Sequence, residues 1–112
     1  MNKTNLYKGS LATIILKLLN EYDKMYGYEI AQKVREITKG DLKLTEGALY
    51  PLLHKLKVQG LLDVEVVKIG GRVRKYYKLT EAGTKETVNK LAELERYIKN
   101  MRALVNPRSR DS

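Results

Sequence analysis

The apolar residues of this chain predict two helices in its first third. Residues 11–19 are apolar nearly all round, which predicts a helix buried on more than one side, with Ser10 as its N-cap. Residues 26–38 carry apolar positions three and four apart, which predicts an amphipathic helix that Gly40 ends in a left-handed conformation. We expect residues 21–24 to be a polar connector between the two.

The next segment predicts a third helix with a proline inside it. Thr45 is the expected N-cap, the helix runs to about Gln59, and Gly60 is its C-terminal stop. Pro51 falls about one and a half turns into the helix, where it lacks the N–H that an α-helix requires. We therefore expect the helix to be irregular before this proline.

After the third helix the apolar spacing becomes two, which is the period of a half-buried strand. Residues 62–66 alternate strictly, Gly70 and Gly71 can turn the chain, and residues 73–79 return as the partner strand. Positions 68–78 hold five cations and no acid, namely Lys68, Arg72, Arg74, Lys75 and Lys78. The pattern predicts a hairpin with a positively charged tip.

The last predicted helix is the longest, with Thr80 as its expected N-cap. Its apolar residues recur three and four apart, at Val88, Leu91, Leu94, Ile98, Met101 and Val105. From Leu91 onward this is a heptad spacing, typical of a helix that pairs with another helix. A helix of about 25 residues is about 37 Å long, more than a small domain can cover.

The long helix therefore predicts a homodimer, most simply one with twofold symmetry. We expect Leu11 and Ile15 of the first helix to join the apolar residues of the last helix in this interface. The alternative is that the last helix folds back over the first helix within one chain.

Composition limits the class of protein. The chain has 112 residues, the size of one domain, and is 43% hydrophobic, enough for one core. It contains no cysteine, which excludes disulfides and thiolate metal sites. The net charge of +9 favours nucleic acid as partner, with an anionic membrane surface as competitor. No apolar run approaches the ~18 residues that span a bilayer, so we expect a cytoplasmic protein with no membrane partner.

The order of predicted elements is that of a winged helix-turn-helix, a mainly α (α+β) fold with a two-stranded wing. The third helix would lie in the DNA major groove, and the wing would lie against phosphate or in the minor groove. Residues 1–80 would form the DNA-binding domain, residues 81–105 the dimerisation helix and residues 106–112 a disordered tail.

Five separated motifs narrow the class further. They are Leu6-Tyr7-Lys8-Gly9-Ser10-Leu11, Met25-Tyr26-Gly27-Tyr28-Glu29-Ile30, the run from Leu44 to Leu56, Gly60-Leu61, and the run from Gly70 to Gly83. Over roughly residues 5–85 the chain resembles the PadR family of bacterial transcriptional regulators. The resemblance implies a homodimeric winged-helix repressor, often of detoxification, efflux or stress genes, and the short subgroup with a single C-terminal helix.

The expected DNA-binding residues lie on the third helix and on the wing, with one lysine before the first helix and one before the third. They are Lys8, Lys43, Thr45, Glu46, Gly47, Ala48, Tyr50, Pro51, His54, Lys55, Arg72, Arg74 and Lys75. The Thr45 hydroxyl and the free amides of the first turn can hold a phosphate. Gly47 either lets the backbone approach DNA or is merely tolerated near a helix start. Tyr50 either contacts DNA or packs under a kink at Pro51.

Three further positions bear on the DNA contact. His54 is the only histidine, and without cysteine or clustered carboxylates it is a poor metal ligand, so we interpret it as a DNA-facing or surface residue. Lys55 can bind phosphate but cannot form arginine's bidentate fork to guanine. It would therefore help to position the protein on DNA rather than read the base sequence. Val73 stands where many family members have arginine, so one wing contact is missing or Val73 begins the strand.

The resemblance also implies an effector. Some family members bind aromatic or amphiphilic compounds between the first and last helices, where Ile14, Leu18 and Tyr97 would line a pocket here. Only Tyr97 supplies a ring on the last helix, which favours core and dimer packing as the use of these residues.

The sequence predicts neither an enzyme nor a cofactor, because it has no glycine-rich phosphate loop and no clustered acid/base pair. We expect a dimeric, sequence-specific regulator on an inverted repeat of double-stranded DNA, a repressor released by a small-molecule effector. The alternatives are a non-specific architectural nucleic-acid-binding protein and a protein-interaction module whose wing is only basic.

Overall fold

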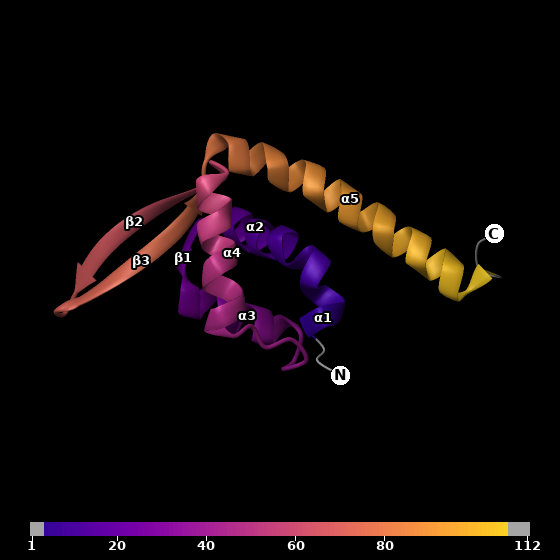
Figure 1. The fold of residues 1–112 in the computed structure, drawn as a ribbon, viewed down its shortest axis with the longest axis horizontal. Helices are drawn as coiled ribbons and strands as arrows, with labels where there is room; N and C mark the ends of the chain where they lie inside the picture. The colour runs from indigo at the N-terminus through magenta and orange to yellow at the C-terminus, as the bar shows by residue number, and fades with distance from the viewer. Residues whose placement is uncertain (1–3, 108–112) are drawn as a thin grey trace.

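The computed structural model describes residues 4–107, and from residue 6 onward their side chains. Figure 1 shows short helices packed together, with a hairpin projecting from one side and a long helix from the other. In chain order the elements are α1 (Thr4–Tyr7), the 3-10 turn η1 (Lys8–Ser10), α2 (Leu11–Tyr22), β1 (Lys24–Tyr26), α3 (Gly27–Ile37), α4 (Glu46–Val58), β2 (Leu62–Ile69), β3 (Arg72–Leu79) and α5 (Glu81–Val105). Of the predicted disordered tail, residues 108–112 lie outside the described residues.

Helix α2 forms the centre of the core, as its apolar sequence predicts. Its buried side chains are Leu11, Thr13, Ile15, Leu16, Leu18 and Leu19. Ser10 does not cap this helix: its backbone is helical and its side chain makes no capping hydrogen bond. The prediction was wrong because the chain already turns helically through α1 and η1 before α2 begins.

The connector predicted at residues 21–24 is instead a helix end, a turn and a third strand. Helix α2 continues to Tyr22, and Asp23 turns the chain with a φ of 68°. Strand β1 then pairs antiparallel with β3, which places Met25 opposite Tyr77, and both side chains are buried. A strand of three residues is too short to show an alternating pattern.

Helices α3 and α4 begin and end within one or two residues of their predicted bounds. Gly40 and Gly60 have φ values of 84° and 79°, which confirms both as left-handed ends. The Thr45 hydroxyl accepts a hydrogen bond from the Ala48 amide at 3.2 Å, which confirms the N-cap.

Pro51 does not interrupt α4, which is one continuous α-helix. A proline at this position removes the N–H that would bond to the carbonyl of Gly47. Both residues are exposed, so water can satisfy that carbonyl. The expectation of an irregular helix before the proline was wrong, because residues 46–50 are already α-helical.

The hairpin of β2 and β3 is confirmed, and it is the wing of the fold. Gly70 and Gly71 both have positive φ, 54° and 78°, the conformation of a two-residue turn that matches the twist of its strands. The register places Ile69 opposite Arg72 next to the turn and Leu62 opposite Leu79 at the base. Strand β3 lies between β1 and β2 in the sheet, so it joins the wing to the helices.

Helix α5 begins at the base of the wing and is confirmed as the longest element. The Thr80 hydroxyl caps it by accepting a hydrogen bond from the Gly83 amide at 2.9 Å. Its first half packs along α2, and its second half extends beyond the rest of the protein (Figure 1). The described part of the chain contains no helix with the length and apolar character that crossing a membrane requires.

Gly83 gives a test of how closely α5 packs on the wing's base. A Cβ at this position would collide with the Leu61 carbonyl oxygen and lie 3.2 Å from Leu79 Cδ2. We expect Gly83→Ala to lower the free energy of unfolding by roughly 1–3 kcal/mol, measured by urea denaturation.

Gly47→Ala is the matched control for this substitution. The nearest atom to a Cβ there is Thr45 Oγ1 at 4.0 Å, so alanine should change stability by less than about 1 kcal/mol. Equal effects of the two substitutions would contradict the close contact at Gly83.

Candidate nucleic-acid interface

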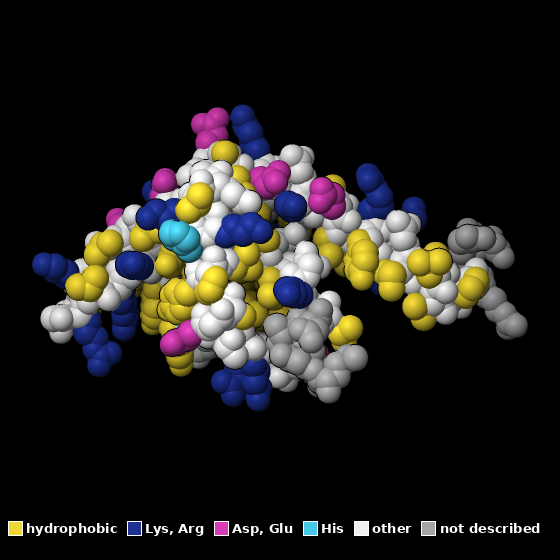
Figure 2. Space-filling model, in the orientation of Figure 1, with side chains coloured by type: hydrophobic (Ala, Val, Ile, Leu, Met, Phe, Trp, Pro, Cys, Tyr) yellow, Lys and Arg dark blue, Asp and Glu magenta, His cyan; other side chains and the backbone are white. Residues whose placement is uncertain are grey.

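Helix α4 has one face in the core and one in solvent. Leu49, Leu53 and Leu56 are buried and hold the helix against the rest of the domain. The outward face of α4 consists of exposed residues three and four apart, namely Gly47, Tyr50, Pro51, His54, Lys55 and Val58. Figure 2 shows the chain's single histidine, in cyan, on the face turned to the viewer with Lys and Arg side chains beside it.

The start of α4 can accept an anion. Thr45 Oγ1 accepts a hydrogen bond from the Ala48 amide, so the hydroxyl proton of Thr45 can be donated to another group. Glu46 lies exposed in the first turn, where the helix dipole favours its negative charge. No contact within the protein requires a glycine at position 47, which is open to solvent.

Tyr50 lies at the edge of the outward face of α4, and its ring packs against the start of α3. A Cβ at Gly27 would lie 2.7 Å from Tyr50 Cζ, so the ring rests directly on this glycine. The residue remains 42% exposed. Burial raises the pKa of the Tyr77 hydroxyl, and the nearby Tyr50 raises it further. The ring thus packs on α3 rather than under a kink at Pro51.

The wing cations lie in different surroundings. Arg72 and Lys75 are exposed, and Figure 2 shows Lys and Arg side chains gathered at the free end of the wing. Arg74 is half-buried, and its guanidinium carbon lies 4.5 Å from the centre of the Tyr26 ring, a cation–π contact. The edge of Tyr76 meets the same ring, with ring centres 5.4 Å apart. Arg74 therefore ties the wing to β1.

An ion pair on the same sheet was not predicted. Lys24 Nζ donates a hydrogen bond to Glu65 Oε2 at 2.7 Å and lies 5.6 Å from the centre of the Tyr76 ring. This hydrogen bond raises the pKa of Lys24 and lowers that of Glu65. The two residues are far apart in the sequence, and they come together because β1 and β2 both pair with β3.

The remaining predicted contacts lie on other elements. Lys8 is exposed in η1, and Lys43 is exposed in the loop before α4. Val73 is the second residue of β3, opposite Lys68, and it is exposed. The strand therefore begins at Arg72, not at Val73.

The residues expected at a dimer interface fall into three groups, which are buried, half-buried and exposed. Leu11 and Ile15 are 6% and 0% exposed within the single chain, so they offer no surface to a partner. Leu91 and Leu94 are half-buried along α5. Val88, before them, and the expected positions after them are exposed, and the exposed large apolar side chains of α5 are Val88, Tyr97, Ile98, Met101, Leu104 and Val105.

The three residues expected to line an effector pocket do not meet in one. A hollow of about 300 Å³ lies where η1 and α2 approach α5, and Tyr97 lines it together with Leu94 and Thr13. Ile14 and Leu18 do not line it, and Leu18 is buried in the core.

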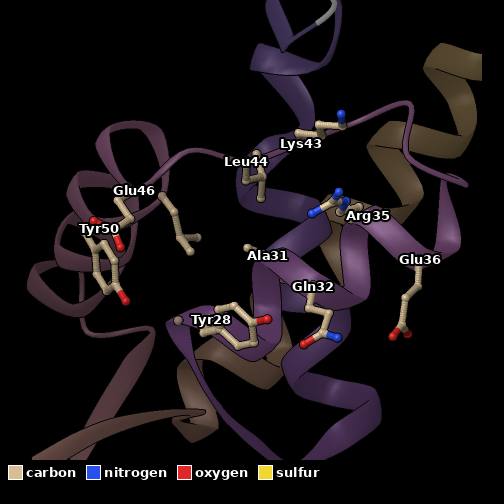
Figure 3. Close-up of a pocket in the computed structure, with 11 residues that line it drawn as sticks. Tyr28, Ala31, Gln32, Arg35, Glu36, Lys43, Leu44, Glu46 and Tyr50 are labelled. Atoms are coloured by element: carbon tan, nitrogen blue, oxygen red, sulfur yellow. The ribbon is translucent and has the colours of Figure 1, made fainter.

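A larger hollow, of about 420 Å³, lies between α3 and the start of α4, and it was not predicted from the sequence (Figure 3). We call it the α3–α4 hollow. Its lining residues are Gly27, Tyr28, Ala31, Gln32, Arg35, Glu36, Lys43, Leu44, Glu46, Leu49 and Tyr50. Over residues 4–107 no group of three or more His, Cys, Asp or Glu side chains is placed to hold a metal ion.

Helices α2, α3 and α4 pack together and are followed by a basic hairpin. This arrangement defines a winged helix-turn-helix protein. Residues 15–89 match the Transcriptional regulator PadR-like family. The chain is also 33% identical over 103 residues to the uncharacterized protein X of Lysinibacillus sphaericus, an alignment that covers 88% of this chain and 93% of that protein. The chain belongs to the PadR-like family of transcriptional regulators.

Solved structures agree with this assignment. A transcriptional regulator from Clostridium thermocellum has a TM-score of 0.83 at 30% identity, covering 91% of this chain and 99% of that one. A PadR-like transcription factor from Bacteroides fragilis has a TM-score of 0.67 at 39% identity, covering 93% and 94%. The Mycobacterium tuberculosis transcriptional regulator Rv3488 is 39% identical over 49 residues, which is 44% of this chain and 46% of that protein.

The Lys24–Glu65 pair predicts a measurable titration. Because the folded state lowers the pKa of Glu65 below 4.5, the pair stabilises the sheet above that pH and the stabilisation is lost as the pH falls through the lowered pKa. We expect Lys24→Met to raise the Glu65 pKa toward its ordinary value, measured by NMR titration of the Glu65 carboxyl carbon.

Lys85→Met serves as the control, because it removes a surface cation paired with Glu81 at 3.6 Å and should leave Glu65 unchanged. If Glu65 titrated identically with and without Lys24, the pair would not be the cause of its lowered pKa.

Proposed function

We propose that this transcriptional regulator is a sequence-specific DNA-binding repressor that acts as a homodimer. The outward face of α4 carries the proposal, because it is a solvent-facing stripe on the second helix of the helix-turn-helix, the helix that enters the major groove in proteins of this fold. The exposed wing cations Arg72 and Lys75 would contact phosphate. Residues 1–80 would form the DNA-binding domain and residues 81–105 the dimerisation helix.

The distal half of α5 supports the dimer. Ile98 is 44% exposed and Val105 is 78% exposed, although both continue the heptad spacing of apolar residues. An apolar stripe that one protomer leaves open is stabilised by burial against a second copy of itself. A twofold dimer would present two α4 helices to half-sites about 34 Å apart, or a multiple of that distance.

An effector that changes the angle between the two protomers would release the DNA, because both α4 helices would no longer fit at once. The hollow beside Tyr97 lies on α5 and is a candidate place for such an effector in the dimer. A non-specific architectural role is the second candidate function, favoured by the net charge of +9.

Titration by fluorescence anisotropy separates these functions. The protein is titrated against the intergenic duplex upstream of its own gene and against a shuffled duplex, at about 150 and 300 mM salt. We expect a gap in affinity of about 10³ or more that persists at the higher salt. Equal affinities that both vanish at the higher salt would contradict the specific regulator and favour the architectural role.

The same titration tests the wing. We expect Arg72→Ala to weaken binding to both duplexes roughly three- to tenfold and to reduce the salt slope by about one, because a phosphate contact carries no sequence information. Lys99→Ala, on the side of α5 away from its apolar stripe, is the control with the same loss of charge. If both variants behaved alike, Arg72 would contribute only net charge.

The dimer has its own test. We expect Ile98→Glu to convert the protein from dimer to monomer, measured by sedimentation equilibrium, because it places a charge in the apolar stripe. Asn100→Glu adds the same charge two residues away, off the stripe, and should leave the dimer intact. A dimer that persisted in the Ile98→Glu variant would rule out pairing through this stripe.

A further inference from the structure

The α3–α4 hollow has an apolar floor and charged residues at one end. Ala31, Leu44 and Leu49 line its interior, and Figure 3 shows Ala31 between Leu44 and Tyr28. Tyr50 forms the wall on α4, opposite the residues of α3 (Figure 3). The volume of about 420 Å³ is in the usual range of small-molecule sites, roughly 300–1,000 Å³.

The charges around the hollow are unevenly distributed. Within the described part of the chain, neither Arg35 nor Lys43 forms an ion pair, and Figure 3 shows both near the same end of the hollow. Of the two carboxylates that also line it, Glu36 is paired with Lys33 at 3.3 Å. Glu46 lies at the other side, on the first turn of α4. The end beside α3 therefore carries unpaired positive charge.

We propose that the α3–α4 hollow binds a small apolar anion, a ring system with one acidic group. The rings would lie on the apolar floor between Tyr28 and Tyr50, and the acidic group would face Arg35. The floor disfavours a DNA phosphate in the same place, because a phosphate against apolar side chains loses its water without replacement. The charge-assisted contact to arginine fixes the orientation of the ligand.

The position of the hollow gives this ligand a direct effect on DNA binding, which rests on the proposed function. Tyr50 lines the hollow and also belongs to the outward face of α4 that is proposed to approach DNA, and Glu46 lines the hollow from the first turn of the same helix. A bound ring against Tyr50 would occupy the start of α4 within one protomer. Ligand and DNA would then exclude each other without any change in the angle between the two protomers.

Two matched dyes test the site in the absence of DNA. 1-Anilinonaphthalene-8-sulfonate is N-phenyl-1-naphthylamine with an added sulfonate, so the two differ in charge but share the same rings. We expect the wild-type protein to bind the sulfonate about tenfold more tightly than the neutral dye, measured by fluorescence titration. Arg35→Gln should remove that difference while leaving the neutral dye unaffected.

Ala31→Phe should abolish the binding of both dyes by filling the floor of the hollow. Lys99→Gln, a cation on α5 outside the hollow, should change neither affinity. Because Arg35 is exposed, its substitution leaves the fold intact even if the variant at position 31 unfolds. Dye binding unchanged by both hollow variants would place the dyes on the open stripe of α5 and overturn the proposal.

Competition is then measured with a far-red-labelled operator duplex. We expect the sulfonate dye at ten times its Kd to weaken DNA binding about elevenfold in the wild-type protein and not at all in Ala31→Phe. Dye bound in the hollow with unchanged DNA affinity would overturn the exclusion but keep the site. Failure to bind any duplex without dye would overturn the proposed function, while the dye titration would still decide the site.

Discussion

The pairing of β1 with β3 is the constraint on which the rest of the molecule depends. It buries Met25 against Tyr77 and so fixes the base of the wing to the chain that leads directly into α3. The same three-stranded sheet brings Lys24 to Glu65 and Arg74 to the ring of Tyr26. A hairpin joined to the domain only by its ends could change its angle freely. Here the wing is hydrogen-bonded through β1 to the helix-turn-helix, so in the proposed DNA complex both would approach the groove and its flanking phosphates together.

The long elements could be predicted from the sequence because each repeats its pattern over several turns or residue pairs. Strand β1 has three residues, and no alternation is visible over that length. Ser10 has the chemistry of an N-cap, but a cap requires an extended backbone, and the preceding helical turn removes it. The pattern also identified Leu11 and Ile15 as buried, but a pattern of burial does not say whether the covering surface belongs to the same chain.

Some parts of the candidate interface could likewise be predicted from the sequence, and others could not. The outward face of α4 follows from its helical period and the buried positions of Leu49, Leu53 and Leu56. The different surroundings of Arg72 and Arg74 could not be predicted, because the ring that Arg74 contacts belongs to a strand that the pattern does not show. The α3–α4 hollow is likewise a product of packing, since its lining comes from two helices and the loop between them.

Helix α5 has a mechanical consequence. It is continuous from its base, where Gly83 fits against the Leu61 carbonyl, to Val105, and it is about 37 Å long. A rotation of five degrees at that base would move the far end by about 3 Å, enough to shift one heptad side chain out of its facing gap. The helix is thus a rigid lever, and the tight contact at its base is where the leverage would be applied.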